Sequence, residues 1–197
     1  GIVVLGALLA VGRTAPAYGT PSGQASRPAL PNAPVVKYEI WVELDDAGKM
    51  LRGREDVIWS NRSREPVAEM LFHLYWNAFK NEESTFLREA AADASLGGRF
   101  APKDGEWGWI DVKDIRTSDG QDLRPTTEFV TRDEPARSGD QTVLRVRFPR
   151  PVRPGEDARL HLDFESKIPR SAARSGYYKN SYFIGQWFPK PGVYEEG

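Results

Sequence analysis

The sequence has 197 residues, of which 40% are hydrophobic and 28% charged, and its formal net charge is -1. This is ordinary for a globular chain with one domain-sized core, and the near-neutral charge gives no electrostatic attraction to nucleic acid, so we expect no nucleic-acid partner. The absence of cysteine excludes disulfides, thiolate zinc sites, cysteine nucleophiles and a lipid-anchored bacterial export signal.

The first residues have the pattern of an export signal. A run of apolar and small residues from Ile2 to Val11 precedes an Ala-x-Ala site that ends at Ala17. The run is too short for a bilayer, which needs about 20 apolar residues, and it is typical of a secretory signal peptide. We therefore predict a signal helix over 1–17 whose start is missing, and an exported, periplasmic or extracellular protein. The alternative is a buried helix or strand of a cytosolic protein.

The composition changes twice after this run. Residues 18–34 are rich in glycine, proline, serine and alanine, which leaves little to bury, and we predict a disordered, flexible linker. From residue 35 onward apolar residues recur at every second position, which is the period of a strand with one buried face. Strands over 38–44 and 50–61, joined by a turn, are expected to form an antiparallel hairpin.

Further short strands follow, with polar turns between them. The third strand is predicted over 67–76, and the last three are predicted over 107–115, 142–148 and 160–165, with a proline-rich connection over 149–157. The segment 81–94 favours one short helix, with Asn81 or Ser84 as the N-cap. Such a series of strands is typical of a sandwich or barrel, and we predict an all-β antiparallel β-sandwich with one short helix.

The sequence contains few candidates for chemistry. A zinc peptidase helix carries His-Glu-x-x-His, but the two histidines, His73 and His161, lie far apart on predicted strands and are expected to be structural. The acidic pairs Asp45–Asp46 and Glu82–Glu83 occupy turn and helix-start positions, although a carboxylate-pair site stays open. No Gly-x-Ser-x-Gly turn or phosphate-binding loop is present. We predict no catalytic residue and no metal ligand in this chain.

Four of the six tryptophans could line a ligand groove, as in a carbohydrate-binding sandwich. The candidates for such a groove are Trp76, Trp107, Trp109 and Trp187. Large aromatic residues also fill strand faces and domain interfaces, and we favour this second interpretation.

Four stretches, in this order, resemble the N-terminal domain of M1-family zinc aminopeptidases, in an exported bacterial branch. They are the strand Tyr38–Asp45 with its Leu51-Arg52-Gly53 partner, the Phe72-His73-Leu74 strand that ends in Asn77-Ala78-Phe79, the Pro154-Gly155 turn with Leu160–Phe164, and Phe183–Tyr194 with Gln186-Trp187-Phe188-Pro189-Lys190. Ordinary members have a cysteine and an acidic residue after this proline, so Lys190 indicates a divergent branch.

The resemblance implies a saddle-like β-sandwich over 35–197, cut at its C-terminal end, that packs on a catalytic domain missing from this chain. Zinc, its glutamate base and the peptide-binding strand would follow Gly197 in that domain. In such enzymes the N-terminal domain can supply a glutamine or glutamate that accepts a hydrogen bond from the free amine of the peptide substrate. Gln186 is the candidate for this role.

The sequence thus predicts a fragment, clipped at both ends, that is itself non-catalytic and whose parent hydrolyses peptides from their N-terminus with zinc. The alternative from another class is a stand-alone periplasmic β-sandwich that binds a ligand or serves as a scaffold.

Overall fold

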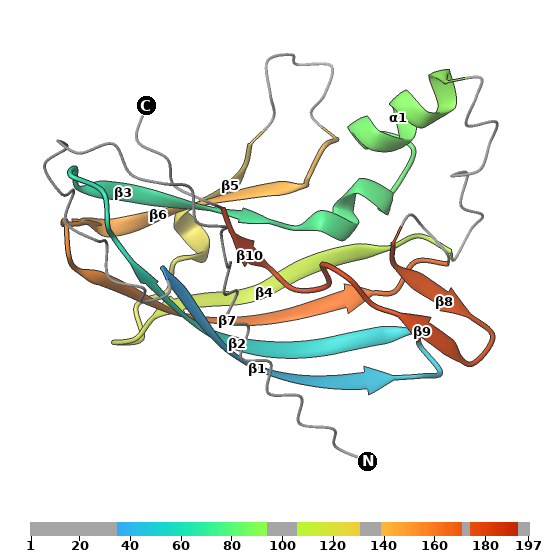
Figure 1. The fold of residues 1–197 in the computed structure, drawn as a ribbon, viewed down its shortest axis with the longest axis horizontal. Coiled ribbons are helices and arrows are strands. Elements are labelled where there is room, and N and C mark those ends of the chain that lie inside the picture. Colours follow the sequence, from blue (N-terminus) through green and yellow to red (C-terminus); the bar gives the residue numbers. More distant parts are fainter. Residues whose placement is uncertain (1–34, 94–105, 131–138, 171–173, 193–197) are drawn as a thin grey trace, which may run out of the picture.

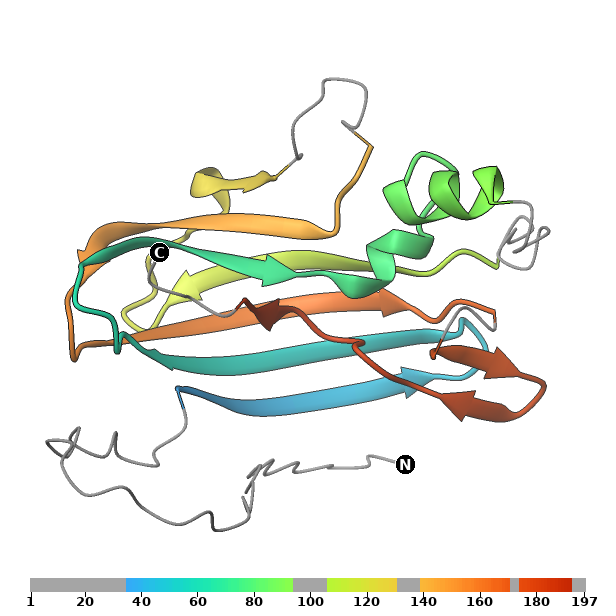
Figure 2. The same ribbon diagram turned by 45° about the horizontal axis from the view of Figure 1, so that its top comes forward.

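In a computed structural model, the residues described are 35–93, 106–130, 139–170 and 174–192. They form two four-stranded antiparallel sheets, a small hairpin and one α-helix, as Figures 1 and 2 show. The predicted all-β antiparallel sandwich with one short helix is confirmed. The predicted signal peptide and linker, and the final residues 193–197, lie outside the described residues.

The first sheet, called sheet A, has the strand order β1-β2-β7-β4, and the second, called sheet B, has the order β10-β3-β6-β5. The strands of sheet A are β1 (Val36–Asp45), β2 (Met50–Ser60), β7 (Asp157–Lys167) and β4 (Trp109–Thr117). The strands of sheet B are β10 (Lys190–Pro191), β3 (Val67–His73), β6 (Val143–Val152) and β5 (Thr127–Phe129). The remaining elements are the hairpin β8 (Gly176–Tyr178) and β9 (Ser181–Phe183), the helix α1 (Thr85–Ala92), and the 3₁₀ turns η1 (Tyr75–Phe79) and η2 (Arg124–Thr126).

The hydrophobic core lies between the two sheets. Alternate residues of β2 and β7 point inward, as the period of two predicts, and Val57, Trp59 and Leu162 are among the buried side chains of sheet A. Sheet B contributes Phe72 and Val146, which are fully buried. The opposite face of sheet A carries charged cross-strand ladders, so each long strand has one apolar and one charged face.

Two strand predictions need correction. The third strand ends at His73 rather than Trp76, because Leu74 leaves the extended region and Tyr75–Phe79 winds into η1. The fifth predicted strand, over 142–148, begins at Val143 and continues into the segment predicted as a proline-rich connection as far as Val152. Pro149 and Pro151 lie where the pairing of β3 and β6 shifts register, between the pairs Glu69–Arg147 and Val67–Val152. At this irregularity the strand can accept proline, which has no backbone N–H to donate to the neighbouring strand.

The helix lies inside its predicted segment, and its cap is Ser84. The Leu87 N–H donates to Ser84 Oγ at 3.2 Å, and Ser84 Oγ donates to the Ala78 carbonyl at 2.7 Å. The first of these bonds satisfies a free amide of the helix, and the second fixes α1 to the end of η1.

The β8–β9 hairpin was not predicted, and a lysine fixes it to the turn between β1 and β2. Lys49 Nζ donates to Asp46 Oδ1 at 2.7 Å and to the hydroxyl of Tyr182 at 2.6 Å. The same ammonium group lies 5.2 Å from the ring centroid of Tyr177 and 5.0 Å from that of Tyr182. The Lys49 ammonium group and the rings of Tyr177 and Tyr182 therefore fix the position of the hairpin from which the chain continues to β10.

Candidate functional site

The predicted amine-binding residue, Gln186, lies in the segment between β9 and β10. Its side chain is exposed, and its φ of 55° is in the left-handed region that few residues other than glycine adopt. The residues on either side of it are held by hydrogen bonds. The Gly185 carbonyl accepts from Trp76 Nε1 at 2.9 Å and from Ser175 Oγ at 2.7 Å, and the Trp187 carbonyl accepts from Ser166 Oγ at 2.8 Å.

The segment Ile184–Pro191, which we call the crossing segment, passes across the inner side of sheet A before its last two residues pair with β3 as β10 (Figures 1 and 2). The Trp187 ring lies 6.0 Å from the Phe164 ring of β7, and the Phe188 ring lies 5.5 Å from the Tyr38 ring of β1. Trp187 and Phe188 also contact each other, with ring centroids 5.3 Å apart. These aromatic contacts hold the backbone so that the Gln186 side chain projects into solvent.

The segment also lies close to a carboxyl group that the sequence-based candidates did not include. Glu55, on the inner face of β2, is fully buried, and neither carboxylate oxygen has a hydrogen-bond partner. Burial raises the pKa of Glu55 well above its usual value, and the negative charge of Asp56 adds to this shift. The sequence did carry a signal for it, since Glu55 has the same parity as Leu51, Val57 and Trp59 on the apolar face of the predicted strand.

The two histidines lie in different sheets. His73 ends β3, where it is exposed and pairs with Val143 and Lys190 across the ladders. His161 lies on β7, with Nδ1 2.7 Å from Asp56 Oδ1 and Nε2 3.6 Å from Asp163 Oδ1. Across the described ranges, no group of three histidine, cysteine, aspartate or glutamate side chains is placed to hold a metal ion.

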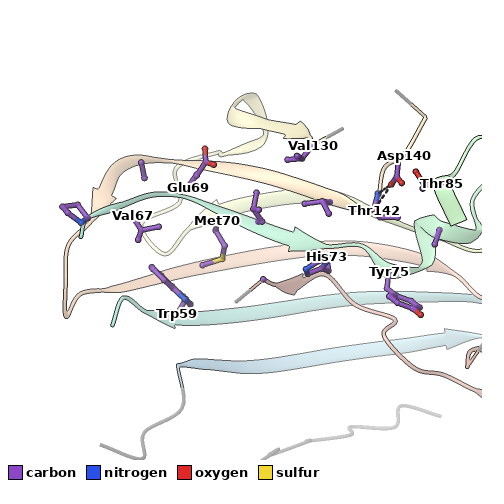
Figure 3. Close-up of a pocket in the computed structure, with 16 residues that line it drawn as sticks. Trp59, Val67, Glu69, Met70, His73, Tyr75, Thr85, Val130, Asp140 and Thr142 are labelled. Carbon is purple, nitrogen blue, oxygen red and sulfur yellow. Dashed lines mark hydrogen bonds between the residues drawn. The ribbon is translucent and has the colours of Figure 1, made fainter. Parts of the chain in front are cut away.

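A groove, which we call the groove over sheet B, follows β3, and Figure 3 shows that the residues lining it lie on both sides of this strand. Thr85 and Asp140 lie together at one end, Val67 and Glu69 lie toward the other, and His73 and Tyr75 lie along β3 and η1. Asp140 accepts hydrogen bonds from the Thr142 amide at 3.0 Å and from its hydroxyl at 2.6 Å, so its carboxylate caps a turn. Most of the lining is apolar, which suits contact with another protein surface or an apolar ligand.

The four tryptophans considered for a ligand groove do not form a shared platform. Trp76 is fully buried in the core, and Trp187 packs on Phe164 and Phe188. Trp109 lies beside Lys113, whose ammonium is 6.0 Å from its ring centroid, and Trp107 is half-buried. These positions favour packing over sugar binding.

Comparison with known proteins adds no assignment to this geometry. A scan against protein-family models gave no match, and a search of the curated proteins gave none either. Among the helices of the described residues, none has both the length and the apolar character needed to cross a membrane.

Proposed function

We propose that this chain is the non-catalytic N-terminal domain of an exported, M1-like zinc aminopeptidase, and that it packs on a catalytic domain of its own protein. The observation that supports this is that the resembling stretches form one contiguous packed unit. Gly53 of the Leu-x-Gly strand lies under Phe164, Phe164 contacts Trp187 of the Gln-Trp-Phe-Pro segment, and Trp76 of the strand-and-turn stretch binds Gly185.

In this proposal the parent's zinc is bound outside the described residues, whose histidines and carboxylates do not fit a zinc site. The domain's own contribution is positional. The crossing segment is fixed by partly buried hydrogen bonds on both sides of Gln186, and the exposed side-chain carbonyl of Gln186 can accept a hydrogen bond from a substrate ammonium. The groove over sheet B offers an apolar surface on which a neighbouring domain can pack.

The proposal is tested by extending the reading frame and assaying the longer protein. We expect a His-Glu-x-x-His helix about a hundred residues beyond Gly197, and zinc-dependent release of N-terminal amino acids by the longer protein. Chain 1–197 alone should hydrolyse no aminoacyl substrate. EDTA-sensitive hydrolysis by the short chain, or a stop codon soon after Gly197, would contradict the proposal. The stop codon would favour the stand-alone binding or scaffold module, for which the groove over sheet B is the candidate surface.

The role of Gln186 can be tested in the same longer protein. Replacing Gln186 by alanine removes a hydrogen bond to a charged group, which is worth about 1.5–3 kcal/mol, so kcat/KM for free-amine peptides should fall roughly ten- to a hundredfold. N-acetylated peptides lack the ammonium, and their slow turnover should not change. Gln121 is exposed in the turn after β4, and Gln121→Ala serves as the matched control. An equal effect of both substitutions would exclude Gln186 from substrate binding.

A further inference from the structure

Glu55 lies where an apolar side chain is expected. Its neighbours across the sheet on the inner face are Ile40 of β1 and Leu162 of β7, and its side chain is fully buried. Neither carboxylate oxygen has a hydrogen-bond donor. A charged carboxylate in such a place is strongly unfavourable, because nothing replaces the water that it has lost.

The crossing segment covers this carboxyl group. Along β2, Glu55 lies between Gly53, which pairs with Phe164, and Val57, which pairs with Tyr38. Trp187 packs on Phe164, Phe188 packs on Tyr38, and the two rings contact each other. The Trp187–Phe188 pair therefore bridges the two inner-face positions that flank Glu55, whose side chain is fully buried.

No cation offsets the charge of Glu55 among the described residues. On the inner face of the adjacent strand β1, the titratable group is Tyr38, whose pKa is raised chiefly by burial. Asp56 follows Glu55 on β2, but it points to the other face, where it binds His161. The residue opposite on β7 is Leu162, and residues 184–188 of the crossing segment contain no ionisable side chain. The inner face of sheet B opposite is apolar, with Met70, Phe72 and Val146.

We propose that the crossing segment is a pH-dependent cover, which stays on sheet A while Glu55 is a neutral acid and lifts from it when Glu55 ionises. Lifting exposes the carboxyl group to water, so the open form releases the proton more readily than the closed form. The inference depends only on the contacts around Glu55, and it holds whether or not the chain belongs to a peptidase. Because the Gln186 backbone is part of the same segment, opening also moves the Gln186 side chain.

The direction of the effect follows from proton linkage. The closed form keeps its proton to a higher pH than the open form, because burial raises the pKa of the Glu55 carboxyl group only while the segment is closed. Opening therefore costs least at high pH. At pH values above the pKa of Glu55 in the open form and below its pKa in the closed form, opening releases one proton. The equilibrium constant for opening therefore rises by roughly tenfold per pH unit in this range.

Hydrogen exchange of the full chain, followed by mass spectrometry between pH 5 and pH 8, tests this inference. We expect the protection factor of peptides from 184–192 to fall as the pH rises, by up to about tenfold per unit. In Glu55→Gln the same peptides should keep a constant protection factor. The unchanged protein and Glu55→Gln are compared at the same pH, because the chemical step of exchange depends on pH equally in both proteins.

Two further variants keep the test decisive. Glu55→Met is neutral and apolar, so it replaces Glu55→Gln if the buried amide prevents folding, and it should show the same constant protection. Glu43→Gln removes an exposed carboxylate of β1 and should behave like the unchanged protein. Equal pH dependence in the Glu55 variants and the unchanged protein would overturn the proposal. So would a parallel loss of protection in β2 and β7, because this would show that the whole sandwich unfolds.

Discussion

Replacing Gly53 by alanine is expected to destabilise the fold by about 3 kcal/mol, a large part of the stability of a domain of this size. A Cβ at this position would lie 2.6 Å from both Cε atoms of Phe164 and closer still to Cζ. The phenyl ring cannot yield easily, because Phe164 is 1% exposed and Trp187 packs on it. Relief requires a strained rotamer of Phe164 or displacement of the crossing segment. Chemical denaturation of the two proteins measures the loss.

A double-mutant cycle separates this clash from the ordinary cost of alanine in a strand. Phe164→Leu alone leaves a cavity and should cost about 1–3 kcal/mol. The alanine Cβ can occupy part of that space, so Gly53→Ala combined with Phe164→Leu should cost clearly less than the two single changes added together. Additive losses would show that Gly53 and Phe164 are not coupled, and the explanation of the Leu-x-Gly pattern would then be wrong.

The long strands were predictable because each has a buried face that repeats every two residues. β2 was found close to its full length, and β1 and the central part of β7 were also found, since their inward positions hold apolar residues and their outward positions hold charges. The helix was found because Ser84 is a good cap, followed by residues that favour helix. The antiparallel pairing of β1 and β2 followed from their short connecting turn.

The elements that sequence patterns missed depend on contacts between residues distant in the chain. The turn η1 interrupts an apolar run because the Asn77 side chain replaces ladder hydrogen bonds. Its amide donates to the Gln141 carbonyl at 2.8 Å, and its carbonyl accepts from the Ile110 amide at 2.8 Å. The strands β8, β9 and β10 have two or three residues each, too few for a period to be visible. β10 exists only because it pairs with β3.

The candidate site was predictable in part. The resemblance placed Gln186 in a segment that the structure shows exposed and fixed on both sides, but it did not show what the segment lies on. Glu55 could have been noticed as a charged residue at an apolar-face position. Its surroundings depend on Leu162 of β7 and on Trp187 and Phe188 of the crossing segment, which are distant from it in the sequence, and no local pattern predicts such an arrangement.

Replacing Trp76 by alanine is expected to cost about 4 kcal/mol, because this side chain is fully buried and joins η1 to the crossing segment. Trp76→Phe keeps most of the apolar volume and removes the indole N–H. It should cost much less, about 1–2 kcal/mol, since the Gly185 carbonyl that loses this donor still accepts from Ser175 Oγ. Thermal or chemical unfolding of the three proteins measures this order.

Trp76 and Ser175 both donate a hydrogen bond to the Gly185 carbonyl, which makes a sharper test possible. When one of the two donors is removed, the other still satisfies this carbonyl. Trp76→Phe and Ser175→Ala leave it one donor apiece, whereas the double variant leaves the carbonyl with neither. An unpaired buried carbonyl costs about 1–3 kcal/mol, and this one is partly buried, so the double variant should be less stable than the sum of the two single losses by about 1 kcal/mol. Hydrogen exchange in 184–188 should rise most in the double variant, because this carbonyl anchors the peptide that precedes Gln186. Strict additivity, with no added exchange in that segment, would mean that packing of the indole ring alone holds the crossing segment in place.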